Sequence, residues 1–123
     1  MLHGRIIAES LRPGAELDVP GLTLTRVSRQ DVSGSVAAGQ PPVWTLIDVA
    51  APAASAGPLA AALSTALAAE GGWYADFRDG PDHVVVFAGQ IFRYAVGDTA
   101  GRQEAVDYGR SVGVPDHQLD WDG

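Results

Sequence analysis

The pattern of apolar and polar positions in the first fifty residues predicts strands separated by turns. Residues 4–11 are expected to form a first strand closed by a Pro-Gly turn, and residues 22–27 alternate apolar and polar side chains. A short strand is expected at 16–19. Residues 28–42 hold Ser, Gly, Gln and Pro with few apolar anchors, so we expect a long surface loop there. Residues 43–49 are then typical of a buried strand.

Two segments have helical spacing. The first is expected to begin at Pro58, because proline fits the first helical turn, and to end at the glycine pair 71–72. The second covers about residues 99–112, with Asp98 or Thr99 as its cap. The inward stripe of the first helix consists of Leu59, Leu63 and Leu67.

Between the helices the sequence predicts three antiparallel strands joined by short turns. The strands are 73–78, 83–87 and 91–96, and the turns are 79–82 and 88–90. We therefore expect a single α+β domain over residues 1–123. Its sheet is mostly antiparallel, with about five to six strands and two helices packed on one face. A right-handed crossover through the first helix would make the strands 43–49 and 73–78 parallel.

The two turns also predict which side chains share a face of the sheet. The core face receives Trp73, Ala75, Phe77, Val84, Val86, Phe92 and Tyr94. The opposite face receives Tyr74, Asp76, Arg78, His83, Val85, Phe87, Ile91 and Arg93. This second assignment depends on the turn at 88–90. If that turn used only Ala88 and Gly89, Phe92 would replace Arg93 on the polar face.

Five residues of the polar face are candidates for binding a ligand. Arg78 and Arg93 suit a carboxylate or phosphate, because a guanidinium fork matches those anions. His83 and Asp76 could exchange protons, and Tyr74 could form an aromatic wall. The alternative is an ordinary solvated sheet face on which opposite charges pair across strands.

Composition narrows the possible functions. The chain has no Cys, and its eight basic residues are all Arg, which excludes Cys nucleophiles, thiolate metal sites and lysine-based catalysis. The formal net charge is −7 and the Arg residues are dispersed, so nucleic-acid binding is not expected. No segment has the length and hydrophobicity of a membrane span or a signal peptide. We expect a cytoplasmic protein with no membrane association, no metal and no cofactor.

Parts of the C-terminal half resemble small uncharacterised proteins of high-GC actinobacteria. The segments that carry this resemblance are Trp73-Tyr74-Ala75-Asp76-Phe77-Arg78, Val85-Val86-Phe87, Phe92-Arg93-Tyr94, Gly113-Val114-Pro115 and Gln118-Leu119-Asp120-Trp121. The Arg-only, Ala-rich composition is consistent with such a source. The resemblance implies no activity and no catalytic residue.

The sequence contains no motif that identifies a function, and two hypotheses remain. The first is a binding or accessory domain that acts through a protein partner, with homodimer formation through an exposed sheet edge. The second is a small enzyme or a binder of anionic small molecules that uses the polar face. The sequence leaves open whether the protein has catalytic activity.

Overall fold

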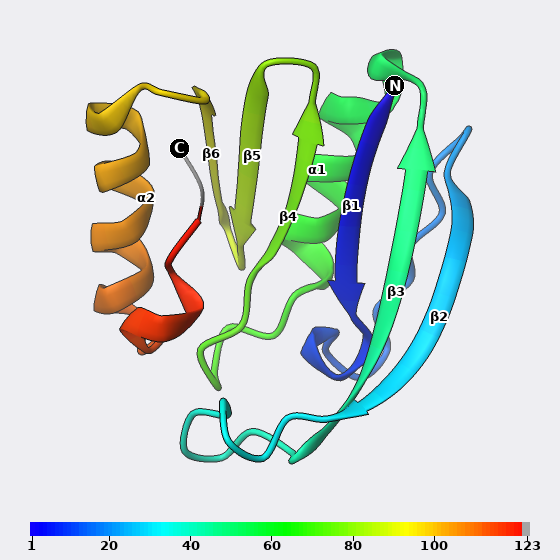
Figure 1. The fold of residues 1–123 in the computed structure, drawn as a ribbon. Helices are drawn as coiled ribbons and strands as arrows, with labels where there is room; N and C mark the ends of the chain where they lie inside the picture. Colours follow the sequence, from blue (N-terminus) through cyan, green and yellow to red (C-terminus); the bar gives the residue numbers. More distant parts are fainter. Residues whose placement is uncertain (122–123) are drawn as a thin grey trace.

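The computed structural model describes residues 1–121 and contains one six-stranded sheet with two helices (Figure 1). The strands are β1 (Leu2–Ile7), β2 (Thr23–Asp31), β3 (Val43–Ala51), β4 (Ala75–Asp79), β5 (Asp82–Phe87) and β6 (Gln90–Ala95). The helices are α1 (Ala56–Ala66) and α2 (Thr99–Ser111), with three short 3-10 turns η1 (Ala8–Ser10), η2 (Ala53–Ser55) and η3 (Asp116–Gln118). The predicted α+β class and antiparallel sheet are confirmed.

The strand order is β2-β3-β1-β4-β5-β6, and every neighbouring pair is antiparallel. The N-terminal strand β1 therefore lies in the middle of the sheet, between β3 and β4. Because both are antiparallel to β1, β3 and β4 run in the same direction, as the sequence predicted. They are not neighbours, however, because β1 separates them.

The two helices cover opposite faces of the sheet, so the prediction that both pack on one face is wrong. Leu59 and Leu63 of α1 share a core with Phe77 and Val84. Ala105 and Val106 of α2 belong to a second core, built with the other side of β5. The reason is that β5 is apolar on both faces: residues 84–87 are all at most 2% exposed. A strand of this kind needs a covering layer on each side.

The first hairpin has the predicted register. Asp76 pairs with Val85 and Phe77 with Val84, as expected. The turn itself is tighter than predicted, since Asp79 pairs with Asp82 and only residues 80 and 81 connect the strands. Gly80 occupies the first turn position at φ +56°, the arrangement of a type II′ hairpin.

The second hairpin corrects the predicted register by one residue. Phe87 pairs with Gln90, so the turn consists only of Ala88 and Gly89. Gly89 has φ +76°, a backbone conformation that glycine adopts without strain. Phe92 consequently lies on the α2 side of the sheet, whereas Arg93 lies on the α1 side.

The N-terminal half differs from expectation in its boundaries. Strand β2 continues to Asp31, so the long loop is shorter than predicted and covers only residues 32–42. Residues 16–19 do not form a strand. Helix α1 ends at Ala66. The next residue, Leu67, forms an isolated antiparallel bridge with Leu11, which follows β1 and η1 in the chain.

The C-terminal segment packs back on the body. The carboxylate of Asp98 accepts a hydrogen bond from the Gly101 amide at 3.1 Å and so caps α2. After α2 ends, Leu119 is 3% exposed and belongs to the α2-side core. The tail thus runs from η3 back along the sheet, between α2 and β6 in the view of Figure 1.

Candidate functional site

Half of the sheet face that carries α2 is left without a helix in front of it (Figure 1). We call this half, formed by β2, β3, β1 and β4, the open face. Four directly paired residues cross it in a row of alternating charge: Arg26, Asp48, Arg5 and Asp76. Opposite charges in directly paired positions stabilise an antiparallel sheet, so this row is consistent with the observed register.

Arg5 and Asp48 form the centre of this row. The Nε and Nη2 atoms of Arg5 donate to the two carboxylate oxygens of Asp48, at 2.7 and 3.3 Å. The hydrogen bond from Arg5 lowers the pKa of Asp48, and nearby Arg26 adds to this effect. The same bond raises the pKa of Arg5, although partial burial opposes the shift. The guanidinium of Arg5 is therefore already held by a carboxylate of the chain itself.

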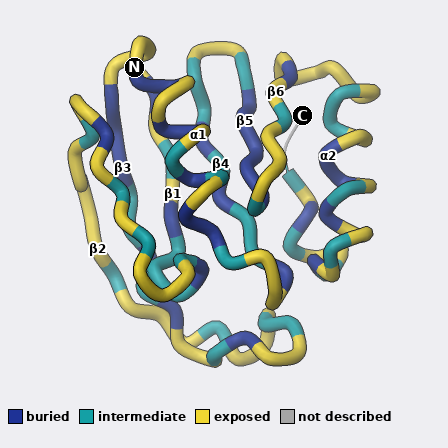
Figure 2. The backbone as a smooth tube through the Cα atoms, turned by 180° about the vertical axis from the view of Figure 1, so that it is seen from behind, coloured by how far each residue is buried: buried dark blue, intermediate teal, exposed yellow. Residues whose placement is uncertain are grey.

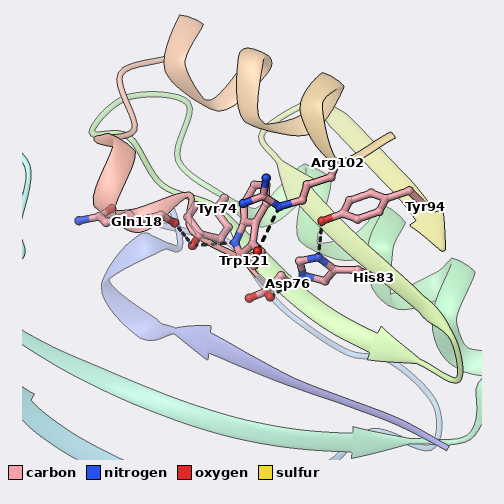
Figure 3. Close-up of polar contacts among 7 residues, drawn as sticks. All are labelled: Tyr74, Asp76, His83, Tyr94, Arg102, Gln118 and Trp121. Carbon is pink, nitrogen blue, oxygen red and sulfur yellow. Dashed lines mark hydrogen bonds and ion pairs between the residues drawn. The ribbon is translucent and has the colours of Figure 1, made fainter. Parts of the chain in front are cut away.

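A buried histidine connects the open face to the α2-side core. His83 is 0% exposed, its Nε2 lies 2.7 Å from Asp76 Oδ2, and its Nδ1 lies 2.6 Å from the Tyr94 hydroxyl (Figure 3). A neutral imidazole satisfies both contacts when Nε2–H donates to Asp76 and Nδ1 accepts from Tyr94. Burial raises the pKa of Tyr94, an effect that Arg102 and Arg78 oppose. The chain of bonds fixes the orientation of Asp76, whose side chain remains 35% exposed.

The C-terminal tail packs against this histidine and covers it. The Trp121 ring meets the His83 ring edge-on, with centroids 5.5 Å apart. Its Nε1 donates to the Tyr74 hydroxyl at 3.2 Å, and Tyr74 in turn donates to the Gln118 carbonyl (Figure 3). Arg102 donates to the Trp121 carbonyl at 3.0 Å. Burial, followed by the charge of Asp76, raises the pKa of Tyr74 well above its usual range.

Two cavities open on this face and meet at Arg5 and Asp76, which line both. The first, which we call the aromatic pocket, has a volume of about 210 Å³. It is lined by Arg5, Ile7, Trp44, Gly72, Trp73, Tyr74, Asp76, Gln118 and Asp120. The second, which we call the charged groove, is shallow and has a volume of about 490 Å³. It is lined by His3, Gly4, Arg5, Thr25, Asp48, Val49, Asp76, Phe77 and Arg78.

The structure brings four of the five predicted site residues to one face. Asp76, Arg78 and His83 lie on the α2 side of β4 and β5, and Tyr74, which precedes β4, packs against the α2-side core, as the sequence predicted. Arg93 does not join them. It lies on the α1 side, where its Nε and Nη2 donate to Asp82 and Asp79, each at 2.8 Å.

The expected pair of guanidiniums is therefore not formed between Arg78 and Arg93, because the shorter turn moves Arg93 to the other face. His83 is also not the exposed group that a solvated sheet face would present.

Sequence reasoning missed the residues that reach the site from distant parts of the chain. Arg5 and Asp48 lie in the site because β1 is inserted between β3 and β4, and no local pattern in the sequence indicated this insertion. The predicted register of β6, which is wrong by one residue, places Tyr94 on the core face instead of beside His83. Trp121 comes from the C-terminal tail, and no local pattern indicated that its ring would pack against His83.

Comparison of the chain with protein-family models, with curated proteins and with solved structures found no match. In residues 1–121, no helix is both long and apolar enough to cross a membrane. No group of three or more His, Asp or Glu side chains in that range is arranged to hold a metal ion.

Proposed function

We propose that the protein is a non-enzymatic binding domain that docks a partner protein on the open face. The observation that carries this proposal is the continuity of the two cavities: a small, partly aromatic pocket opens into a broad, shallow groove, and Arg5 and Asp76 line both. A shallow groove suits an extended segment of chain, and an adjoining pocket suits one of its side chains.

The size of the pocket supports a partner larger than the pocket itself. Sites that enclose a whole small molecule usually measure roughly 300–1,000 Å³. The aromatic pocket, at about 210 Å³, is smaller than this range. It suits a single side chain or a comparable group better than a nucleotide or another large cofactor.

The chemistry of the lining supports binding rather than catalysis. Two lining hydroxyls bond backbone carbonyls: Thr25 donates to Asp48 at 3.2 Å and Tyr74 donates to Gln118. Neither is activated by a neighbouring base, as a nucleophile would require. Tyr94, the hydroxyl that contacts His83, is itself buried at 5% exposure and lines neither cavity.

Selection of short random peptides on the purified protein tests this proposal. We expect the selected peptides to shift backbone amide resonances of β1, β3 and β4 on the open face. His3→Trp would fill the groove and weaken their binding, because His3 is exposed and lines it. Ile91→Trp adds the same ring on β6, outside both cavities, and should leave binding unchanged. Selected peptides that bind equally to both variants would contradict the proposal, as would a failure to select any.

A further inference from the structure

We infer that the aromatic pocket accepts a single positively charged group, an alkylammonium or an alkylguanidinium. This inference rests on the proposed function, since it names the chemistry that the open face would recognise. It draws on the walls of the pocket, on the charges around it and on its size.

Three aromatic rings form part of the walls. Trp44 and Trp73 line the pocket with their ring centroids 5.3 Å apart, and Tyr74 lines it as well. The polar atoms of two of these rings are already used: Trp44 Nε1 donates to the Pro41 carbonyl at 2.9 Å, and the Tyr74 hydroxyl donates to the Gln118 carbonyl. These rings therefore offer mainly carbon surface, which attracts cations through its π electrons.

The charges around the pocket favour a cation. Asp76 and Asp120 bring two carboxylates to its lining. The lining cation, Arg5, is engaged by both carboxylate oxygens of Asp48, so it offers little attraction to an anion. The pocket is thus lined by two carboxylates and one guanidinium, and the whole chain carries a formal net charge of −7.

The geometry disfavours an anionic occupant. Binding a carboxylate or phosphate would call for guanidinium groups directed at it. Arg78 lines the groove but not the pocket, and Arg93 lies on the opposite face of the sheet. The pocket therefore differs in charge from the anion site that the sequence suggested.

Such a cation could belong to a free amine or to a basic side chain of a docked peptide. Both present the same charged group at the end of an aliphatic chain. A peptide would in addition occupy the groove, which adjoins the pocket at Arg5 and Asp76. The two sources can therefore be separated by whether binding depends on the groove.

The test compares small probes of matched shape by NMR titration of the full chain. Butylammonium and butylguanidinium should shift the resonances of Trp44 and Trp73, whereas butyrate and butanol should not. Asp76→Asn should weaken butylammonium about fivefold, on the order expected for losing one charge at a partly desolvated cation site. Asp107→Asn removes the same charge from exposed α2 and should have no effect.

Two further measurements keep the test decisive. Because Asp76 also forms a hydrogen bond with His83, thermal melting checks that Asp76→Asn still folds. Asp120→Asn removes the second lining carboxylate without touching that bond, and so tests the effect of lining charge on butylammonium binding independently of His83. Peptides with one central Arg or Lys should bind wild type and lose affinity in His3→Trp, whereas butylammonium should be unaffected by His3→Trp.

The possible failures separate the two proposals. Butyrate binding as well as butylammonium, or an absence of butylammonium binding, would overturn the cation inference, even if neutral peptides still mapped to the groove. Butylammonium binding with no peptide binding would uphold the cation inference, identify a free amine as its source, and overturn the docking of a partner protein.

Discussion

Single residues on this protein acquire their roles from contacts across strands. Glu9 is an example that lines neither cavity of the open face: its carboxylate accepts from the backbone amide of Thr45 at 2.6 Å and from its hydroxyl at 2.8 Å. These bonds tie η1 to β3. Partial burial of Glu9 raises its pKa, but the hydrogen bonds from Thr45 outweigh burial, so its pKa lies below the ordinary value of 4.5.

The lowered pKa of Glu9 predicts a dependence of stability on acid pH. Ionised Glu9 contributes stability that is present above about pH 4.5 and is lost as the pH falls through its lower folded pKa. Glu9→Gln should therefore lower the free energy of unfolding at pH 7, and should lose less stability between pH 5 and pH 3 than wild type loses. Urea denaturation at several pH values measures both effects. The same change at exposed Glu70 is the control, and an identical pH dependence for Glu9→Gln and wild type would contradict the prediction.

At the scale of elements, two helical glycines show how closely each helix approaches its surroundings. A Cβ added at Gly101 of α2 would lie 2.6 Å from Tyr94 Cβ, whereas one added at Gly57 of α1 would meet nothing within 4 Å. Alanine is the better helix former at both positions. The difference in effect between the two substitutions therefore reports the packing of α2 against β6.

Gly57→Ala should stabilise the protein by about 0.5–1 kcal/mol, because alanine reduces the entropy of the unfolded chain. Gly101→Ala should destabilise it by about 1–3 kcal/mol, because the added methyl group must displace β6 or α2. Thermal melting of the two variants measures the difference. A stabilising Gly101→Ala would show that α2 does not lie this close to β6.

The β5–β6 hairpin supplies a second prediction at this scale. Phe87 is 2% exposed and contacts Phe92 and Tyr108, with ring centroids 5.9 and 5.0 Å away. Phe87→Ala should cost about 3–5 kcal/mol. Ile91 is 42% exposed on the edge strand, and Ile91→Ala should change stability by less than about 1 kcal/mol. Equal losses in urea denaturation would contradict the two-residue turn that places these side chains.

Local patterns predicted the elements better than the way they combine. Strands, helices and the register of β4 and β5 follow from alternation and turn residues, which act over a few positions. The Ala88-Gly89 turn lacks the Asn-Gly signal of tight hairpins, so the sequence did not distinguish two turn residues from three. The side taken by α2 did have a signal: Val84, Val85, Val86 and Phe87 form a continuous apolar run, typical of a strand covered on both faces.

The candidate site was harder to predict because it is non-local. The β4–β5 hairpin correctly placed Asp76 beside His83, but the partners Arg5 and Asp48 depend on the insertion of β1 into the sheet. Such long-range pairings have no signature within a single segment of the sequence.

In the molecule as a whole, burial differs sharply between β5 and the edge strand β2. Strand β5 is covered on both faces, whereas eight of the nine residues of β2 are exposed (Figure 2). Among them are Leu24 and Val27, at 59% and 56% exposure. One edge of β2 pairs with β3 and the other faces no strand of residues 1–121. This long edge is where pairing between two copies of the chain would occur if the protein forms a homodimer.

Amide hydrogen exchange should reveal this gradient and test the edge. In an antiparallel edge strand, alternate N–H groups point away from the partner strand. We therefore expect alternate β2 amides to exchange rapidly in dilute solution, while β1, β4 and β5 exchange slowest. If the rapid set becomes protected as protein concentration rises, β2 pairs between copies. Val27→Lys should then abolish that protection, because a charge on an exposed edge opposes strand pairing. Slow exchange of every β2 amide at all concentrations would contradict the exposed edge, since it would require another segment to cover β2 within the monomer.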